Sequence, residues 1–154
     1  MPGRPTSEET GFTLVELLIV VTILAILASI GVPKYLLALE TSRKTKVVQD
    51  LRTISFEIDH WFVTHKELPE TLSLRFDPWG NPYQYTNFDV LKQQNGSGIG
   101  QMRKNRFQVP INSDYDLWSM GPDGQSQMPL TAKVSRDDII RANDGRYIGP
   151  VSEY

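Results

Sequence analysis

The sequence contains no cysteine, few histidines and almost no net charge. The absence of cysteine among its 154 residues excludes a disulfide framework, a thiolate metal site and a thiol nucleophile. The chain has 16 basic and 18 acidic residues, and its formal net charge of −2 argues against a general nucleic-acid-binding surface. The two histidines, His60 and His65, have no third ligand or nucleophile at a suggestive spacing. We therefore expect a protein that is not an enzyme.

Charge is also absent from a long stretch near the N-terminus. Residues 17–33 contain no charged side chain, and only Thr22 and Ser29 among them are polar. A helix of this length is just long enough to cross a bilayer core of about 30 Å. Glu16 precedes the stretch, and a carboxylate deep in hydrocarbon costs roughly 2.5 to 3.5 kcal/mol, so it needs a partner. A new α-amino group at Phe12 would be a suitable cation, because it would stand four residues earlier.

The residues around Glu16 resemble the type III signal of type IV pilins and of the pseudopilins of type II secretion systems. The matching segment is Gly11-Phe12-Thr13-Leu14-Val15-Glu16. The resemblance implies that a prepilin peptidase removes residues 1–11 by cutting after Gly11, and that the new N-terminus, Phe12, becomes N-methylated. It also implies that Glu16 pairs with the N-terminal amine of a neighbouring subunit during assembly.

Two other interpretations of the apolar segment stay open. An ordinary secretory signal peptide needs a small-residue cleavage site, which Gly31-Val32-Pro33 could supply, and a simple membrane anchor needs none. Neither explains the carboxylate of Glu16 at the start of the segment. More basic residues follow the segment than precede it, so the positive-inside rule alone favours the opposite orientation. The resemblance implies a single-pass protein of the bacterial inner membrane, with a cytoplasmic leader and a periplasmic C-terminal domain.

An amphipathic pattern follows the apolar segment. Apolar residues recur at spacings of three and four and predict a helical stem over residues 34–64. These residues are Val47, Leu51, Ile54, Ile58, Trp61 and Phe62. We expect Pro33, with Gly31 nearby, to loosen or bend the helix between its two halves. We expect residues 12–33 to span the membrane before assembly and to lie in a filament core afterwards. Outside lipid, only copies of the same helix can cover these residues.

Residues 65–154 are expected to form a β-rich periplasmic domain. Turn residues dominate residues 77–82, and the aromatic alternation after them predicts a strand. The segment Asp77-Pro78-Trp79-Gly80-Asn81-Pro82-Tyr83 and residues 115–124 resemble the major pseudopilins of type II secretion. The resemblance implies an α+β, pilin-like fold: a long N-terminal α-helix packed on a small antiparallel β-sheet, with a C-terminal loop or short helix. Residues 86–112 form an insert relative to that family.

A calcium site is implied by the same resemblance. Its ligands would match the backbone carbonyl near Met120 and the acids Asp123, Asp137 and Asp138. Calcium takes six to eight oxygen ligands, commonly from acidic loops of this kind. The residues also allow a second interpretation, because Ser135 and Asp138 have the spacing of a capping box and would begin a short helix over residues 137–142.

The resemblance implies a structural role. The protein would polymerise into a helical homopolymer, a periplasmic filament that helps export folded proteins through an outer-membrane secretin. Its other partners would be the prepilin peptidase, minor pseudopilins, an inner-membrane assembly platform and a cytoplasmic assembly ATPase. The alternative is a type IV pilin, from a surface pilus or a DNA-uptake pilus. Nucleic acid would then contact the basic cluster at residues 103–106, for which a solvated loop is the simpler interpretation.

Overall fold

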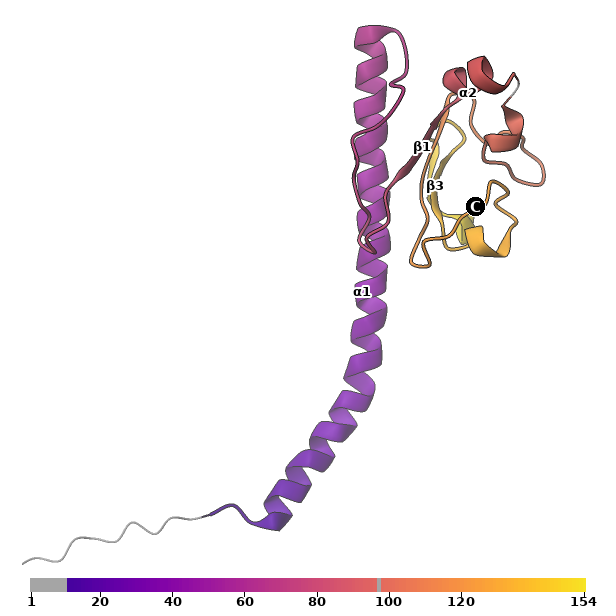
Figure 1. Cartoon of the computed structure of the whole chain (residues 1–154). Helices are drawn as coiled ribbons and strands as arrows, with labels where there is room; N and C mark the ends of the chain where they lie inside the picture. The colour runs from indigo at the N-terminus through magenta and orange to yellow at the C-terminus, as the bar shows by residue number, and fades with distance from the viewer. Residues whose placement is uncertain (1–10, 97) are drawn as a thin grey trace, which may run out of the picture. The chain divides into compact units, whose positions relative to one another are not determined.

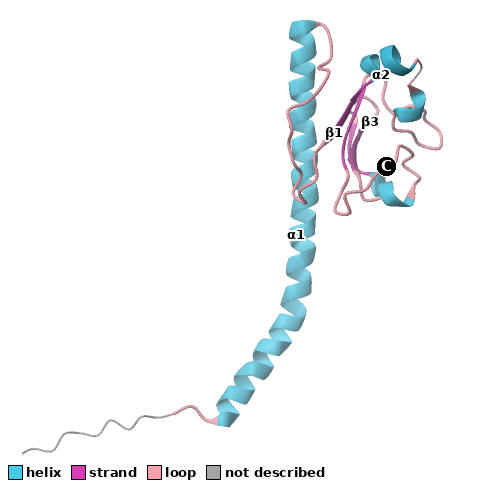
Figure 2. Ribbon diagram, in the orientation of Figure 1, coloured by secondary structure: helices cyan, strands magenta, loops and turns pink. Residues whose placement is uncertain are grey.

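The computed structural model describes residues 11–96 and 98–154. Its first element is the helix α1 (Leu14–His65, 52 residues), which runs from indigo to magenta in Figure 1 and is cyan in Figure 2. The chain forms two compact units, one up to Glu40 and one from Thr41 to Tyr154, so α1 contributes to both. Helix α1 continues without a break through Gly31 and Pro33. The bend expected at Pro33 stays a prediction.

The second unit contains a four-stranded antiparallel sheet. Its strands are β1 (Gln84–Asn87), β2 (Tyr115–Ser119), β3 (Ile139–Ala142) and β4 (Tyr147–Pro150), and they lie in the order β1-β2-β3-β4. Neighbouring strands pair with Tyr85 opposite Leu117, Trp118 opposite Ile140, and Ile140 opposite Gly149. Tyr85, Trp118 and Ile140 are aromatic or β-branched, and such residues pack well on a pleated surface.

The sheet buries side chains on both of its faces. Because side chains alternate along a strand, Tyr115 and Leu117 lie on one face of β2 and Trp118 lies on the other. The first face packs against the stem part of α1, in a core made of Val47, Leu51, Ile54, Ile58, Tyr115, Leu117 and Ile139. The second face carries a core made of Ile111, Trp118, Leu130, Ile140 and Ala142. The predicted α+β fold, with a long helix packed on a small antiparallel sheet, is confirmed.

The stem pattern is confirmed except in its last turns. Val47, Leu51, Ile54 and Ile58 are buried, whereas Trp61 and Phe62 are 44% and 47% exposed. After α1 the chain turns at Lys66, which has a φ of 63°, and then runs back along the helix (Figure 1). This returning segment packs Leu68 and Leu72 against the core. The large side chains of the last turns stay half exposed.

The insert folds into helical turns with a small core of their own. Helix α2 (Phe88–Asn95) follows β1 directly, because the Asn87 side chain caps it by accepting hydrogen bonds from the N–H groups of Asp89 and Val90, at 2.8 and 3.4 Å. The 3₁₀ turn η1 (Ile99–Gln101) comes next. Three residues of this part, Phe88, Leu91 and Met102, form a separate buried cluster.

The short helix considered for residues 137–142 is wrong. Residues Ile139–Ala142 form β3, and Ser135 ends the 3₁₀ turn η2 (Lys133–Ser135). The Ser135 hydroxyl is hydrogen-bonded to the backbone N–H and carbonyl of Gln127, both at 2.9 Å, so it caps no helix. Consecutive isoleucines are buried here on opposite faces of the sheet, which suits a strand. At the C-terminus, where a loop or short helix was expected, the structure has the 3₁₀ turn η3 (Val151–Glu153).

Candidate functional site

Glu16 lies in the first turn of α1 and takes part in the cap at the N-terminus of the helix. Its carboxylate accepts hydrogen bonds from the Thr13 N–H at 3.0 Å and from the Thr13 hydroxyl at 2.8 Å, and the hydroxyl accepts one from the Glu16 N–H at 3.2 Å. This reciprocal arrangement is a capping box, which satisfies N–H groups that the helix itself leaves without partners. The Thr-x-x-Glu spacing is the sequence signal for this cap, and the expected contact between subunits does not account for it.

The processing site lies at the edge of the described residues. Gly11 and Phe12 precede the helix, and the Phe12 side chain is 85% exposed. The rest of the predicted leader, residues 1–10, lies outside the described residues. The cut after Gly11, the methylation of Phe12 and the pairing of its amine with Glu16 therefore stay predictions.

The first part of α1 exposes a continuous apolar surface. Every residue from 11 to 39 is exposed, and residues 17–33 carry no charged side chain. By length and composition this helix can cross a membrane. Covering one large apolar side chain is worth roughly 1.5 to 3 kcal/mol. A surface of this size therefore needs lipid or protein around it.

The polar groups of this segment are suited to apolar surroundings. The hydroxyls of Thr22 and Ser29 donate to the carbonyls of Ile19 and Ile26, at 2.8 and 2.7 Å. A hydroxyl bonded to its own helix leaves no unsatisfied donor in lipid or in a protein core. Gly31 has open space around it, since a Cβ there would meet no atom within 4 Å. The chain itself does not require glycine at this position.

The two downstream segments that resemble the major pseudopilins are hydrogen-bonded to each other. The buried carboxylate of Asp77 accepts from the N–H groups of Trp79 and Asn81 within its turn, at 3.0 and 2.9 Å, and from the Ser119 hydroxyl at 2.6 Å. The Asn81 amide donates to the Gly121 carbonyl at 2.8 Å. The turn at residues 77–81 is thereby held against the loop that follows β2.

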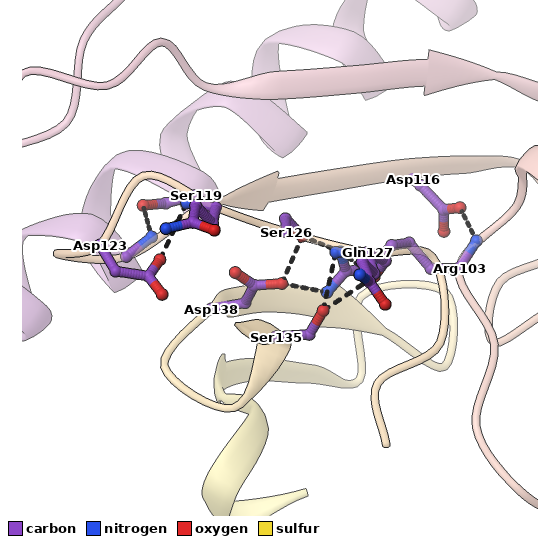
Figure 3. A network of polar contacts seen from close by, with 10 residues as sticks. Arg103, Asp116, Ser119, Asp123, Ser126, Gln127, Ser135 and Asp138 are labelled. Atoms are coloured by element: carbon purple, nitrogen blue, oxygen red, sulfur yellow. Dashed lines mark hydrogen bonds and ion pairs between the residues drawn. The ribbon is translucent and has the colours of Figure 1, made fainter. Parts of the chain in front are cut away.

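The calcium site expected at Met120, Asp123, Asp137 and Asp138 stays a prediction. In the part of the chain that the structure describes, no three His, Cys, Asp or Glu side chains are grouped so that they could hold a metal ion. Asp123 is exposed and accepts a hydrogen bond from the Gln125 N–H at 2.8 Å. Asp137 lies beside the backbone of Gly121. Figure 3 shows Asp123 and Asp138 in separate hydrogen-bond networks.

Asp138 is paired with an arginine. Arg103 Nη2 donates to Asp138 Oδ2, and the Ser126 hydroxyl donates to the same oxygen at 2.6 Å (Figure 3). The two charged side chains are 1% and 0% exposed. Burial raises the pKa of the Asp138 carboxyl, and the hydrogen bonds from Ser126 and Arg103 oppose that rise. A buried charge is expensive without a partner, so each side chain depends on the other.

Asp116 on β2 is a second buried carboxylate. It accepts hydrogen bonds from the Arg103 N–H at 2.6 Å and from the Asn112 amide at 2.9 Å. Its burial raises its pKa to about 6, although both hydrogen bonds lower it. The Asn112 amide also donates to the carbonyl of Arg141 at 3.0 Å. Asp116 and Asn112 therefore fasten the end of the insert to the sheet.

The basic cluster at residues 103–106 is not uniformly solvated. Arg106 is exposed and Lys104 is half-buried, but Arg103 is buried. The interpretation as a solvated loop is therefore wrong for Arg103. No local pattern revealed this, because its acidic partner lies 35 residues away. Neutralising Arg103 would remove an interior contact and would not test nucleic-acid binding.

Comparison with known proteins gives consistent matches. Residues 7–32 match the family described as the prokaryotic N-terminal methylation motif. The type II secretion system core protein G of Klebsiella pneumoniae is 31% identical over 140 residues, which cover 86% of this chain and 93% of that protein. The core protein G of Vibrio cholerae is 34% identical over 129 residues, covering 60% and 88%. That of Pseudomonas aeruginosa is 29% identical over 144 residues, covering 77% and 87%.

No solved structure matches the chain at a significant level. The methylation motif includes Gly11, Phe12 and Glu16, which are the residues expected to govern processing and assembly. The match to the Klebsiella pneumoniae core protein G covers 86% of the chain and therefore extends into the sheet-bearing unit, whose fold is the one expected for pseudopilins. The chain therefore belongs to the family of type II secretion system core proteins G, the major pseudopilins.

Proposed function

We propose that this protein is the structural subunit of a type II secretion pseudopilus, a periplasmic filament that helps export folded proteins through an outer-membrane secretin. The observation that carries the proposal is the exposed, mostly apolar surface of residues 11–39, in which Glu16 is the single carboxylate. Membership of the core protein G family supports it, and the names of the relatives do not favour a type IV pilin. The role is mechanical, and we assign no enzymatic activity to the chain.

The filament follows from the need to cover the apolar helix. Before assembly, lipid covers it, and the protein is a single-pass inner-membrane protein with its leader in the cytoplasm and its sheet-bearing unit in the periplasm. After extraction from the membrane, the helix can avoid water only among identical helices. A contact between different surfaces of identical subunits that does not close on itself generates an open fibre.

Glu16 sets the register between subunits. Both hydrogen bonds to its carboxylate use Oε2. Oε1 can therefore accept a hydrogen bond from the N-terminal amine of Phe12 in a neighbouring subunit while the helix cap stays in place. Any other register would leave both charges unpaired in apolar surroundings, which is costly.

The proposed partners follow from this assembly route. A prepilin peptidase exposes and methylates the Phe12 amine. An inner-membrane platform and a cytoplasmic ATPase add subunits, minor pseudopilins take part in the filament, and the secretin forms the exit.

Two substitutions of Glu16 test the proposal and separate its cap from its charge. Glu16→Leu removes both, whereas Glu16→Gln keeps an oxygen that can accept from Thr13 but removes the charge. We expect both variants to insert in the membrane and to lose their leader, and neither to form fibres. The measurement is electron microscopy of fibres sheared from cells that overproduce the secretion system. Normal fibres from Glu16→Gln would sink the ion-pair proposal and leave capping as the role of Glu16.

A further inference from the structure

The insert places an arginine side chain in the interior of the second unit. The Arg103 side chain is 1% exposed. Its Nη1 donates to the Ser126 hydroxyl and, at 3.1 Å, to the Gln127 carbonyl, and its Nη2 donates to Asp138. The guanidinium carbon also lies 5.0 Å from the centre of the Trp118 ring. One cation thus joins a hydroxyl, a carbonyl and a carboxylate from residues 126–138 (Figure 3).

The main chain of the insert is fastened at the same place. The Arg103 N–H donates to Asp116 at 2.6 Å. The Lys104 N–H donates to the Met128 carbonyl at 3.1 Å, and the Leu130 N–H donates to the Lys104 carbonyl at 2.8 Å. These bonds hold the insert beside the loop after β2. Hydrogen bonds of the Arg103 and Lys104 main chain therefore hold the guanidinium in position.

The three oxygens around Arg103 are of the kinds that a hard cation prefers. A guanidinium can satisfy the same oxygen acceptors instead, by donating hydrogen bonds from N–H groups that lie in a rigid plane. A divalent ion at Asp138 would have to displace this buried guanidinium or lie close to it, where like charges repel strongly. Asp123 does not supply a second carboxylate there, because it is exposed and belongs to a separate turn.

We propose that Arg103 is the resident cation of this domain, and that it replaces a calcium ion in holding residues 126–127 to Asp138. The insert of residues 86–112 then has a structural function, because it carries the arginine into the interior. The sheet-bearing unit keeps its fold and its C-terminal segment in place without a divalent metal. This role does not depend on filament formation, so it can be tested on unassembled protein.

The first test is thermal unfolding of the purified full-length protein in detergent, with millimolar calcium chloride and with excess EDTA. We expect the same melting temperature in both conditions. A melting temperature several degrees higher in calcium would overturn the proposal. This comparison uses the wild-type chain and therefore does not depend on the folding of any variant.

The second test compares two arginines of the same loop in EDTA. We expect Arg103→Met to lower the melting temperature by on the order of 10 °C, because it leaves Asp138 buried without its cation. Arg106→Met is the matched control, and we expect no change because Arg106 is exposed. An unchanged melting temperature for Arg103→Met would overturn the proposal.

A third variant tests the pairing itself. In Arg103→Met the uncompensated charge of Asp138 should account for much of the loss, so adding Asp138→Asn should recover part of the melting temperature. Additive losses from the two substitutions would contradict the pairing. Recovery of the Arg103→Met variant by calcium alone would support it, because the vacated acceptors would then bind the ion that the arginine replaces.

Discussion

Glu16 has one role that the structure shows and a second that the proposed function gives it, and a single carboxylate can hold both at once. As a capping residue it accepts two hydrogen bonds from Thr13. As the only charge at the start of an apolar helix it also needs a cation whenever it enters a low-dielectric environment. The cap uses one carboxylate oxygen, which leaves the other for a subunit contact. Under the proposed function, its position in the helix would serve both local structure and assembly.

The processing residues give a prediction about the mature N-terminus. If the motif match at residues 7–32 reflects cleavage after Gly11, the mature chain begins at methylated Phe12. Mass spectrometry of protein purified from cells with an active prepilin peptidase should detect this terminus, and a peptidase-deficient strain should retain the leader. A mature chain starting after Val32 would instead identify an ordinary signal peptide.

Asp116 gives a prediction about pH. Its pKa is about 6 in the folded protein, above its ordinary value of 3.8. Protonation therefore favours the folded state: the contribution of Asp116 to stability is complete below its ordinary pKa and is lost as the pH rises through about 6. This difference in pKa corresponds to roughly 3 kcal/mol.

Asp116→Asn isolates this effect, because the amide does not titrate. We expect the melting temperature of the variant to rise relative to that of the wild type as the pH increases from about 4 to about 8, measured by circular dichroism in detergent. Asp123→Asn, which changes an exposed aspartate, is the control and should give a smaller trend. A wild-type-to-variant difference that is constant over this range would contradict the assignment.

Among the elements, the turn at residues 77–81 and the loop after β2 depend on each other. Asp77 and Ser119 share a hydrogen bond, and so do Asn81 and Gly121. Gly121 has a φ of 66°, and a Cβ there would lie 2.5 Å from the Asp137 carbonyl oxygen. A glycine is needed at this point because the backbone of the loop passes directly beside Asp137, two residues before β3.

Gly121→Ala should therefore destabilise the protein by about 2 to 4 kcal/mol, from backbone strain and from contact with Asp137. Gly80→Ala is the matched control: Gly80 also has a positive φ, of 92°, but a Cβ there would meet no atom within 4 Å. It should cost only the strain of about 1 kcal/mol. Urea unfolding of both variants measures the difference, and equal losses would argue against the close approach at Gly121.

The elements that the sequence predicted well are those whose signals are local. Val47, Leu51, Ile54 and Ile58 repeat with the period of a helix, and their burial follows from that period alone. The strand expected from the aromatic alternation after residues 77–82 is confirmed as β1, Gln84–Asn87. The turn at residues 77–81 was marked by proline and glycine, whose backbone preferences act within a few residues.

The remaining features depend on contacts between distant residues. Residues 137–142 have helix-like spacing, but pairing with two neighbouring strands makes Ile139–Ala142 a strand. Arg103 belongs to a basic run that is polar by composition, and only the approach of Asp138 makes its burial possible. Trp61 continues the apolar stripe, yet the returning chain leaves it half exposed. The periodicity of apolar residues in a segment does not indicate which distant segments pack against it.

At the level of the whole molecule, the two units have opposite requirements. The unit from Thr41 to Tyr154 buries its own apolar residues in three clusters. The part of α1 before it buries none of its large apolar side chains within the chain. The second unit can therefore bury its core within one chain. The first unit needs lipid or other copies of the protein to cover its apolar side chains.

Gly31 gives a prediction at this level. Because a Cβ at this position meets nothing within 4 Å, Gly31→Leu should leave expression, membrane insertion and cleavage unchanged. It should reduce the yield of sheared fibres, since small residues allow helices to approach closely. Ala25→Leu provides a comparison at another small residue of the same helix. Full fibre yield from both variants would show that close approach is not needed.

The hydroxyls of Thr22 and Ser29 donate to carbonyls one turn back, and this matters when the helix leaves the membrane. Because both acceptors belong to the same helix, the segment can move from lipid into an apolar protein interface without breaking either hydrogen bond. The polar side chains of this segment therefore set no preference of their own between the bilayer and a packing of helices.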